Sequence, residues 1–371
     1  MELTLTKEQL DMRAFVQSFA NQEIKPNVPA MEQDHFPTEI VEKMGIQGLM
    51  GIPIPEEYDG LGKDFISYII AIHEISKVSA AVGVILSVHT SVGTNPILNF
   101  GTNAQKETYI PKLAKGNYLG AFALTEPHAG SDAAKLRLKA SKTETGYELN
   151  GSKMFITNGK EADTFITFAR TGEGVGAKGI SAFVVEKDNP GLSIGKNEQK
   201  MGLHGTSTVM LHFDRCQLDK RQLLGNEGEG FRVAMANLNA GRIGIAAQAL
   251  GIAQAAFHYI SNEVKQRHNK SQNTLFRLAE MATKVEAATL LVYKAAFLME
   301  RQIPCVQEVS KAKLFTTKTA REITIDAIDL MGNDAMGEAC PLARYFRDAK
   351  VTEIYEGTSE IQRIVISKHM M

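Results

Sequence analysis

Hydrophobic and polar residues follow different periods along the chain, and these periods divide it into three parts. Over residues 1–117 the apolar positions mostly recur every three or four residues, which is the spacing of one helix face. Helical stretches are predicted over residues 36–49, 65–77 and 80–88. The first part of the chain is therefore predicted to be a helical N-terminal domain.

The first helix is predicted to begin at Thr6. Thr6 and Gln9 have the spacing of a capping box, in which each side chain bonds to the backbone of the other residue. Two prolines, Pro26 and Pro29, are predicted to end this segment, because proline interrupts the hydrogen bonding of a helix interior. Three apolar residues are predicted to share one face: Leu10, Phe15 and Phe19.

Between residues 118 and 224 the pattern changes to short runs rich in β-branched and aromatic residues. Four of these runs are predicted strands: 147–150, 164–169, 180–186 and 209–213. Turn-forming pairs such as Asn150-Gly151 and Asn158-Gly159 punctuate them. Short strands at regular spacing are typical of an antiparallel barrel or sandwich, which is the fold predicted for a middle β domain.

From residue 225 onward the helical period returns and continues almost to the end of the chain. The runs 243–263, 274–300 and 307–330 are long enough for bundle helices. The glycine-rich segment 225–230 lacks the Lys-Ser/Thr of a phosphate-binding loop, and a plain strand-to-helix connection is favoured. The predicted fold is thus mainly α with a β middle domain, and residues 225–371 form a C-terminal four-helix bundle.

Composition and charge exclude several classes of protein. Lys and Arg number 41 against 42 acidic residues, so no bulk positive field favours nucleic acid or anionic lipid. Cys216, Cys305 and Cys340 are far apart, which supports neither a disulfide framework nor a zinc cluster. The chain shows no signal-like leader and no apolar run of about 18 residues. We expect a soluble cytoplasmic protein that binds neither nucleic acid nor membrane.

General catalytic motifs give little. The sequence contains no GxSxG, HExxH, GxxxxGK[ST] or strand-to-helix GxGxxG pattern. His73-Glu74 lacks the second histidine of a metal-binding helix, and no metal site is expected. These patterns alone would leave a three-part protein of unknown activity.

Six stretches resemble the acyl-CoA dehydrogenase family, in that family's order and across nearly the whole chain. They are ALTEPHAGSD (123–132), NGSKMFITN (150–158), KMGL (200–203), GNEGEGF (225–231), GRIGIAAQALG (241–251), and RDAK (347–350) leading into IYEGTSEIQR (354–363). The helical, β, helical order is also similar to this family's fold. Residues 87–91, SVHTS, resemble the short-chain (butyryl) branch.

The resemblance implies a reaction. Family members oxidise an acyl-CoA thioester to the 2-enoyl-CoA with FAD and pass the electrons to an electron-transfer flavoprotein. By resemblance Glu356 is the base at the α-carbon, and flavin N5 accepts the hydride from the β-carbon. In the family the backbone N–H of this glutamate and a ribityl hydroxyl polarise the thioester carbonyl. A carboxylate suits proton abstraction when desolvation raises its pKa, so Glu356 is expected in an apolar pocket.

The resemblance also implies the binding residues. Some relatives carry the base at the position of Gly241, which glycine cannot supply. The positions that match the family's FAD contacts are Phe122, Leu124, Thr125, Gly130, Ser131, Phe155, Thr157, Arg267, Gln272, Gly332, Thr358 and Glu360. The positions that match its substrate contacts are Ser131, Asn239, Arg242, Tyr355, Gly357 and Lys368. Asparagine at 239 replaces the usual aspartate, and lysine at 368 stands where arginine is common.

The sequence departs from the family where a neighbouring subunit reaches the FAD. The loop after Arg267, His268-Asn269-Lys270-Ser271, is shorter than the family's and lacks its Phe-Gly. Asp329 replaces a glutamine, and Asn333 replaces a glycine. At an effective dielectric of about 20, an aspartate roughly 4 Å from a pyrophosphate charge costs on the order of 4 kcal/mol.

Two interpretations of these changes remain. In one, Asp329 re-pairs with Arg267 or Lys270 and FAD binds less tightly; in the other, the cofactor subsite or the subunit arrangement has changed. The first is favoured, because Glu356 and the segments around Thr125 and Thr157 are intact.

The predicted function is FAD-dependent dehydrogenation of an acyl-CoA, of short chain length, in fatty acid metabolism. One alternative is the same chemistry on an acyl or aminoacyl group carried by a carrier protein. Another is a flavin-poor relative that binds thioesters or eliminates a β-substituent without net redox. The expected partners are the acyl-CoA, an electron-transfer flavoprotein and further copies of the chain, in a homotetramer or a dimer.

Overall fold

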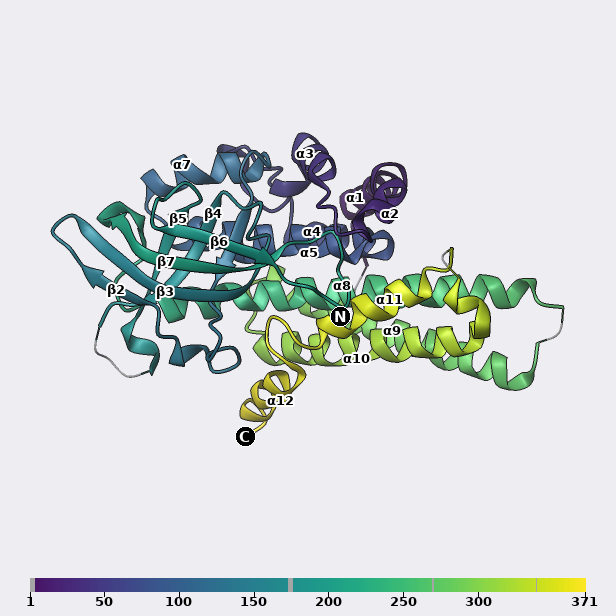
Figure 1. Ribbon diagram of the computed structural model, residues 1–371. Coiled ribbons are helices and arrows are strands. Elements are labelled where there is room, and N and C mark those ends of the chain that lie inside the picture. The colour runs from purple at the N-terminus through teal and green to yellow at the C-terminus, as the bar shows by residue number, and fades with distance from the viewer. Residues whose placement is uncertain (1–3, 173–175, 269, 338) are drawn as a thin grey trace.

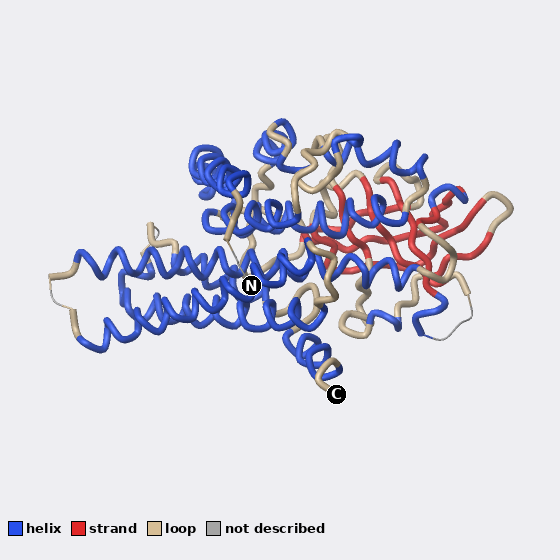
Figure 2. The backbone as a smooth tube through the Cα atoms, turned by 180° about the vertical axis from the view of Figure 1, so that it is seen from behind, coloured by secondary structure: helices blue, strands red, loops and turns tan. Residues whose placement is uncertain are grey.

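The computed structural model describes residues 4–172, 176–268, 270–337 and 339–371. A β-sheet lies at one end of the molecule, a long helical bundle extends to the other end, and the N-terminal helices lie against both (Figure 1). The view from behind shows the same division, with all strands gathered at one end (Figure 2). The helical, β, helical order predicted from the sequence is confirmed.

The N-terminal part contains α1 (Lys7–Phe19), α2 (Val28–Met31), α3 (Thr38–Ile46), α4 (Phe65–Val78), α5 (Ala80–Val88), α6 (Asn95–Phe100) and α7 (Asn103–Ala114). The capping box at Thr6 and Gln9 is present, because each side chain bonds to the other's backbone. A second box, Thr102 with Gln105, begins α7.

Two expectations for the first helix are wrong. Leu10 is 48% exposed and Phe15 39% exposed, whereas Phe19 is buried. Nine residues are two and a half helical turns, so Leu10 lies opposite Phe19 rather than beside it. The prolines do not end the segment either. The chain continues through a π turn (Ala20–Ile24) and a 3₁₀ turn (Lys25–Asn27) into α2, with a proline in the first turn of each short helix, where no N–H is needed.

The strands are β1 (Gly120–Ala123), β2 (Lys139–Lys142), β3 (Gly146–Thr157), β4 (Thr164–Arg170), β5 (Ile180–Glu186), β6 (Leu192–Asn197), β7 (Thr208–Asp219) and β8 (Leu223–Leu224). They form one sheet in the order β6-β7-β3-β2-β4-β5-β8, with β1 beside β4. Most pairs are antiparallel, as expected, but β1 and β2 pair with β4 in parallel.

Strands β4 and β5 are buried on both faces, which explains their continuous apolar runs. Phe165 and Phe183 point into the core of the sheet domain. Phe168 and Val184 point the other way and pack with residues of α7 and of the beginning of α8 (Gly230–Gln266). The sheet is therefore fixed against the helical parts on one of its faces.

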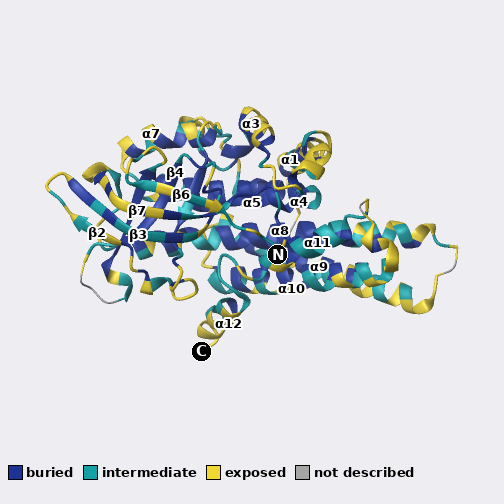
Figure 3. Cartoon of the chain, in the orientation of Figure 1, coloured by how far each residue is buried: buried dark blue, intermediate teal, exposed yellow. Residues whose placement is uncertain are grey.

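The C-terminal part is a bundle of α8, α9 (Gln272–Glu300), α10 (Val306–Met331) and α11 (Leu342–Thr352). The short helix α12 (Ser359–Lys368) projects from it and ends the chain (Figure 1). Segment 225–230 connects β8 to α8, as predicted for a plain strand-to-helix connection. Burial is deepest where α4, α5 and α8 meet, whereas α12 and the distal ends of α9 and α10 are largely exposed (Figure 3).

Two helical stretches have the length and composition of membrane spans: 80–100 and α8. Their most apolar windows are 89% and 72% buried inside the protein, because α8 packs on α4, α5 and α10. Both are accordingly core helices of the fold.

Candidate active site

Glu356 lies in the short connection between α11 and α12. Its backbone is in the left-handed region, with φ of +51°, and Gly357 follows with φ of +92°. Non-glycine residues rarely adopt this conformation, which costs of order 1–3 kcal/mol and persists only where the surrounding structure enforces it. The surrounding structure therefore holds this connection in a strained conformation.

The carboxylate of Glu356 is shielded from water although the residue as a whole is half-buried. Both of its oxygens are inaccessible to solvent and have no hydrogen-bond partner among the described residues. Burial raises the pKa of Glu356 to about 7, and the positive charges of Lys313 and Arg242 oppose that rise. Such a carboxyl group can accept a proton near neutral pH.

Gly241 on α8 makes the space for this carboxylate. A Cβ added at Gly241 would lie 2.8 Å from Cδ of Glu356 and closer still to Oε2. Any side chain at this position would therefore displace the carboxylate. The glycine at position 241 therefore decides where the carboxylate of residue 356 can lie.

Polar residues of α8 surround the connection. Arg242 is 8% exposed, donates from Nη1 to Oδ1 of Asn239 at 3.1 Å, and has a buried Nε with no partner in the described chain. The hydroxyl of Tyr355 donates to Oε1 of Gln248, whose Nε2 donates to the carbonyl of Ala80 at 2.7 Å. Arg242, Tyr355 and Gly357 thus lie near Glu356, and Asn239 lies beside Arg242.

Sequence reasoning missed two residues near Glu356. Lys313 on α10 is buried, and its Nζ donates to the carbonyl of Gly357 at 2.9 Å. Tyr68 on α4 is fully buried. Burial raises the pKa of its hydroxyl, and the negative charge of Glu356 adds to that rise. A signal for Lys313 was available, because it falls in the spacing of the apolar face that Val309 and Ala320 share.

Seven of the twelve predicted flavin contacts lie on β1, the loop after it and β3. Lys153 is fully buried and donates from Nζ to the carbonyl of Leu124 and to Oε1 of Glu126, both at 2.9 Å. The N–H of Met154 donates to the carbonyl of Thr125 at 2.8 Å. These bonds hold the loop against β3.

Phe155 is exposed in a way that requires explanation. It is 57% exposed, has φ of +59°, and lies at a register shift between β3 and β7. Nearby in sequence, Thr157 is half-buried. An aromatic face presented on a strained bulge can stack on a planar ring.

The loop residues themselves are open to a ligand. Gly130 and Ser131 are exposed, and a Cβ added at Gly130 would meet no atom within 4 Å. Phe122 packs on Phe168 with ring centroids 4.9 Å apart and belongs to the same apolar cluster as Tyr355. Phe122 and Tyr355 therefore pack against one apolar cluster, and the exposed Phe155 ring and the open Gly130 loop fit a planar cofactor.

Three predicted cofactor residues lie elsewhere. Arg267 and Gln272 are at the α8–α9 turn and Gly332 is at the end of α10, at the distal end of the bundle (Figure 1). At 1.5 Å per residue, Arg267 lies about 40 Å along α8 from Asn239. One chain cannot bring these residues to the Glu356 connection.

Asp329 does form a local pair, but with a different partner from the two expected. Nη2 of Arg277 lies 3.5 Å from Oδ2 of Asp329 and 2.8 Å from Oδ1 of Asp326. Arg267 instead donates to the carbonyl of Leu330 at 2.9 Å. Arg277 is the partner of Asp329 because α9 lies directly beside α10. Asn269 of the shortened loop lies outside the described residues.

The remaining predicted residues are on α12. Thr358 caps this helix by accepting from the N–H of Ile361 at 3.4 Å, and Glu360 pairs with Arg363 at 3.0 Å. Lys368 is exposed in the last turn.

His73, the discarded metal candidate, is buried between the Tyr293 hydroxyl and Oε1 of Gln254. No group of three potential metal ligands occurs within the described ranges.

The chain combines a helical–β–helical fold with a shielded carboxylate whose pKa burial raises to about 7. The sequence matches three family descriptions: "Acyl-CoA dehydrogenase, N-terminal domain" over 6–117, "middle domain" over 121–216 and "C-terminal domain" over 228–371. The chain belongs to the acyl-CoA dehydrogenase family.

Similar proteins agree with this assignment. The chain is 55% identical to an acyl-CoA dehydrogenase of Bacillus subtilis (strain 168), over 99% of each chain. It superposes on butyryl-CoA dehydrogenase from Megasphaera elsdenii with a TM-score of 0.97 at 41% identity, over the whole of both chains. It also matches, with a TM-score of 0.97 at 44% identity and full coverage of both, a chain in a structure described as "Electron transferring flavoprotein of Acidaminococcus fermentans".

Proposed function

We propose that the protein dehydrogenates a short-chain acyl-CoA to the 2-enoyl-CoA, with FAD as cofactor and Glu356 as the base. The observation that carries this proposal is the carboxylate of Glu356, which is shielded, unpartnered within the described residues and has a pKa of about 7. The short chain length is supported by the likeness to butyryl-CoA dehydrogenase.

Glu356 removes the proton from the α-carbon of the acyl group. Its ionised form is destabilised by burial, so proton uptake from a weak carbon acid is more favourable than for a carboxylate in water. The cations of Arg242 and Lys313 keep a substantial fraction ionised near neutral pH. The proton ends on an oxygen of Glu356, next to Gly241.

Bound FAD supplies the acceptor for the hydride that leaves the β-carbon. On this chain the residues proposed to hold it are Phe122, Leu124, Thr125, Gly130, Ser131, Phe155, Thr157, Thr358 and Glu360. Phe155 offers an exposed aromatic face, and the Lys153 and Met154 bonds keep the loop around Thr125 in place.

The acyl-CoA is proposed to lie along Ser131, Asn239, Arg242, Tyr355, Gly357 and Lys368. Arg242 provides a buried guanidinium whose Nε has no partner in the described structure, so it can still bind an acceptor. Lys368 would meet phosphate as a point charge without the fork geometry of arginine.

The assembly is proposed to be a homo-oligomer, a tetramer or a dimer. Arg267, Gln272 and Gly332 are about 40 Å along the bundle from Asn239, so they can contact the same FAD only in a second copy. The proposed electron acceptor is an electron-transfer flavoprotein, which the likeness to the Acidaminococcus fermentans chain supports. We place the protein in cytoplasmic fatty acid metabolism and propose domains at 1–117, 118–224 and 225–371.

The test is the visible spectrum of the purified protein before and after anaerobic addition of butyryl-CoA. A flavin spectrum that bleaches supports cofactor, substrate class and direction together. Glu356→Gln should remain yellow and lose the bleaching, whereas Glu107→Gln, an exposed acid on α7, should bleach like the wild type. A protein that binds no flavin after FAD is added back, or a Glu356→Gln variant that still bleaches, would refute the proposal.

A carrier-bound substrate is the second candidate. Asn239 lacks the charge of the usual aspartate, and a carrier lacks the CoA nucleotide that Lys368 would meet. Comparing kcat/KM on butyryl-CoA with that on the same acyl group attached to a carrier protein separates the two. Preference for CoA supports the first candidate, and preference for the carrier supports the second.

A further inference from the structure

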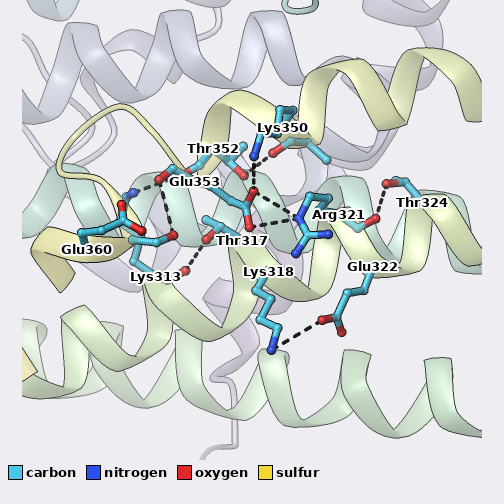
Figure 4. Close-up of polar contacts among 12 residues, drawn as sticks. Lys313, Thr317, Lys318, Arg321, Glu322, Thr324, Lys350, Thr352, Glu353 and Glu360 are labelled. Carbon is cyan, nitrogen blue, oxygen red and sulfur yellow. Dashed lines mark hydrogen bonds and ion pairs between the residues drawn. The ribbon is translucent and has the colours of Figure 1, made fainter. Parts of the chain in front are cut away.

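Lys313 is a buried lysine, and its role in the proposed mechanism has so far been limited to the effect of its positive charge on Glu356. It is 1% exposed on α10, and its Nζ donates to the carbonyl of Thr352 at 3.0 Å and to the carbonyl of Gly357 at 2.9 Å. Figure 4 shows Lys313 on α10 near Thr352 at the end of α11. Both of these hydrogen bonds are to backbone oxygens, and neither is to a carboxylate.

These two carbonyls bracket the connection that carries Glu356. Thr352 is the last residue of α11, where helix carbonyls lack partners within the helix and the helix dipole favours a cation. Gly357 follows Glu356 directly, and both residues have a left-handed backbone. Nε2 of Gln362 on α12 also donates to the Gly357 carbonyl at 2.9 Å. The ammonium therefore ties both ends of segment 352–357 to α10.

Glu353 is the other acid near Lys313, but it is already paired. Its carboxylate accepts from Nε of Arg321 at 3.1 Å and from Nζ of Lys350 at 3.0 Å, and Figure 4 shows this cluster at the end of α11. Of the acids acting on Lys313, Glu356 has the largest effect, ahead of Glu353. The Lys313 ammonium is bonded to the carbonyl of the residue that follows Glu356, and the carboxylate of Glu356 has no hydrogen-bond partner among the described residues.

The groups around Glu356 come from four elements. Lys313 of α10 and Arg242 of α8 act as cations, and the hydroxyls of Tyr68 on α4 and of neighbouring Tyr355 face it as neutral groups. Burial lowers the pKa of Lys313 to about 8, so at pH 7 the lysine is still mostly protonated. A buried cation that is not hydrogen-bonded to an acid lowers the stability of the fold unless its charge is balanced by a nearby anion.

We propose that Lys313 is a positioning residue for proton abstraction: its ammonium fixes the left-handed Glu356–Gly357 backbone through the two carbonyls and stabilises the ionised carboxylate of Glu356. This inference rests on the proposed role of Glu356 as the base. A purely structural lysine would fix the backbone without acting on the ionisation of Glu356, and that difference can be measured.

The experiment compares three substitutions at one position with a matched control. Lys313→Met removes charge and donors, Lys313→Gln keeps an uncharged donor, and Lys313→Arg keeps the charge. Lys318→Met is the control, because Lys318 lies on the same helix with a side chain 60% exposed and pairs with Glu322. The measurement is kcat/KM for butyryl-CoA from pH 5.5 to 9.5, with thermal unfolding and flavin content for each variant.

In the wild type the rising acid limb of kcat/KM is expected near pH 7. In Lys313→Gln and Lys313→Met it should move up by about one unit or more, because the positive charge that lowers the pKa of Glu356 has been lost. At pH 7 a shift of one unit lowers kcat/KM about fivefold, because the ionised fraction of Glu356 falls from about one half to about one tenth, while Lys313→Arg and Lys318→Met keep the wild-type limb.

An acid limb that stays in place in folded, flavin-containing Lys313→Gln would overturn the proposal. If Lys313→Met fails to fold, Lys313→Gln and Lys313→Arg still decide it, since they differ in charge and both donate hydrogen bonds. Activity retained by Glu356→Gln would remove the base assignment itself, whatever the lysine variants do. Inactive Glu356→Gln together with an unshifted limb would leave the base assignment standing and reject only the role of Lys313.

Discussion

Replacing Glu356 with glutamine should stabilise the protein, and the gain should grow with pH. Glutamine keeps the size of the side chain and tolerates the same left-handed backbone, but it cannot ionise. In the wild type, ionisation of the shielded carboxylate opposes folding, because burial raises its pKa from the ordinary 4.5 to about 7. A group whose pKa is raised by folding stabilises the fold below its unfolded pKa, and that contribution disappears as pH rises through the folded pKa.

The magnitude follows from the two pKa values. A difference of about 2.5 pKa units corresponds to about 3.4 kcal/mol of unfolding free energy. The wild type has lost nearly all of this stabilisation at pH 8, but only about 0.4 kcal/mol of it at pH 4.5. For 371 residues the unfolding entropy is roughly 0.8 kcal/mol per kelvin, if the chain unfolds as one unit. The melting temperature of Glu356→Gln relative to the wild type should therefore rise by about 4 °C between pH 4.5 and pH 8.

The assay is thermal unfolding of both proteins across this pH range, with Glu107→Gln as the control. Glu107 is an exposed acid on α7, so its replacement should give a difference that does not change with pH. Comparing differences between pH values removes any constant effect of the substitution. A difference between Glu356→Gln and the wild type that is flat from pH 4.5 to 8 would show that the carboxylate is not desolvated.

Further substitutions test the surroundings of the site. Gly241→Ala should lower kcat/KM by more than about a hundredfold, because the new methyl group displaces the Glu356 carboxylate. The melting temperature should stay unchanged or rise with alanine's helix propensity, and full activity would contradict the contact between position 241 and Glu356. Phe155→Ala should leave the melting temperature of the apoprotein nearly unchanged, since the ring is 57% exposed, but weaken FAD binding about tenfold by equilibrium dialysis; unchanged binding would exclude stacking. Lys153→Met should destabilise the fold by about 3–5 kcal/mol in urea unfolding, because it leaves the Glu126 carboxylate buried without its cation. Adding Glu126→Gln should restore part of that stability, and a fully stable Lys153→Met variant would refute the role of this ion pair.

Local patterns were sufficient for much of the fold. Residues 80–88 and 180–186 were predicted with the bounds that α5 and β5 have, because each is a continuous apolar run between polar or turn residues. Helix α7, in contrast, was not singled out. Its sequence is polar and contains Pro111, and its burial depends on Tyr109, Ile110 and Leu113 packing under the sheet. The parallel pairing of β1 with β4 was missed for a related reason, since 40 residues separate the partners and no local signal specifies them.

The candidate site divides in the same way. Glu356 and the segments around Thr125 and Thr157 were found from contiguous motifs, because the chemistry needs those residue types next to one another in sequence. Lys313 and Tyr68 belong to no such motif. They come from α10 and α4, and only the packing of those helices against α8 and the α11–α12 connection brings them near the carboxylate. Asp329 shows the same limit: its need for a local partner was expected, but the choice of Arg277 depends on how α9 lies beside α10.

The sequence by itself determined the order of helical and β parts, the family motifs and the identity of the proposed base, because periodicity, capping and short motifs are local properties of the chain. Only the tertiary structure decided how that base is tuned. The pKa of Glu356 depends on its burial against Gly241 and on two cations from α8 and α10. Desolvation and charge act through space, so residues more than a hundred positions apart along the chain set the ionisation of one carboxylate.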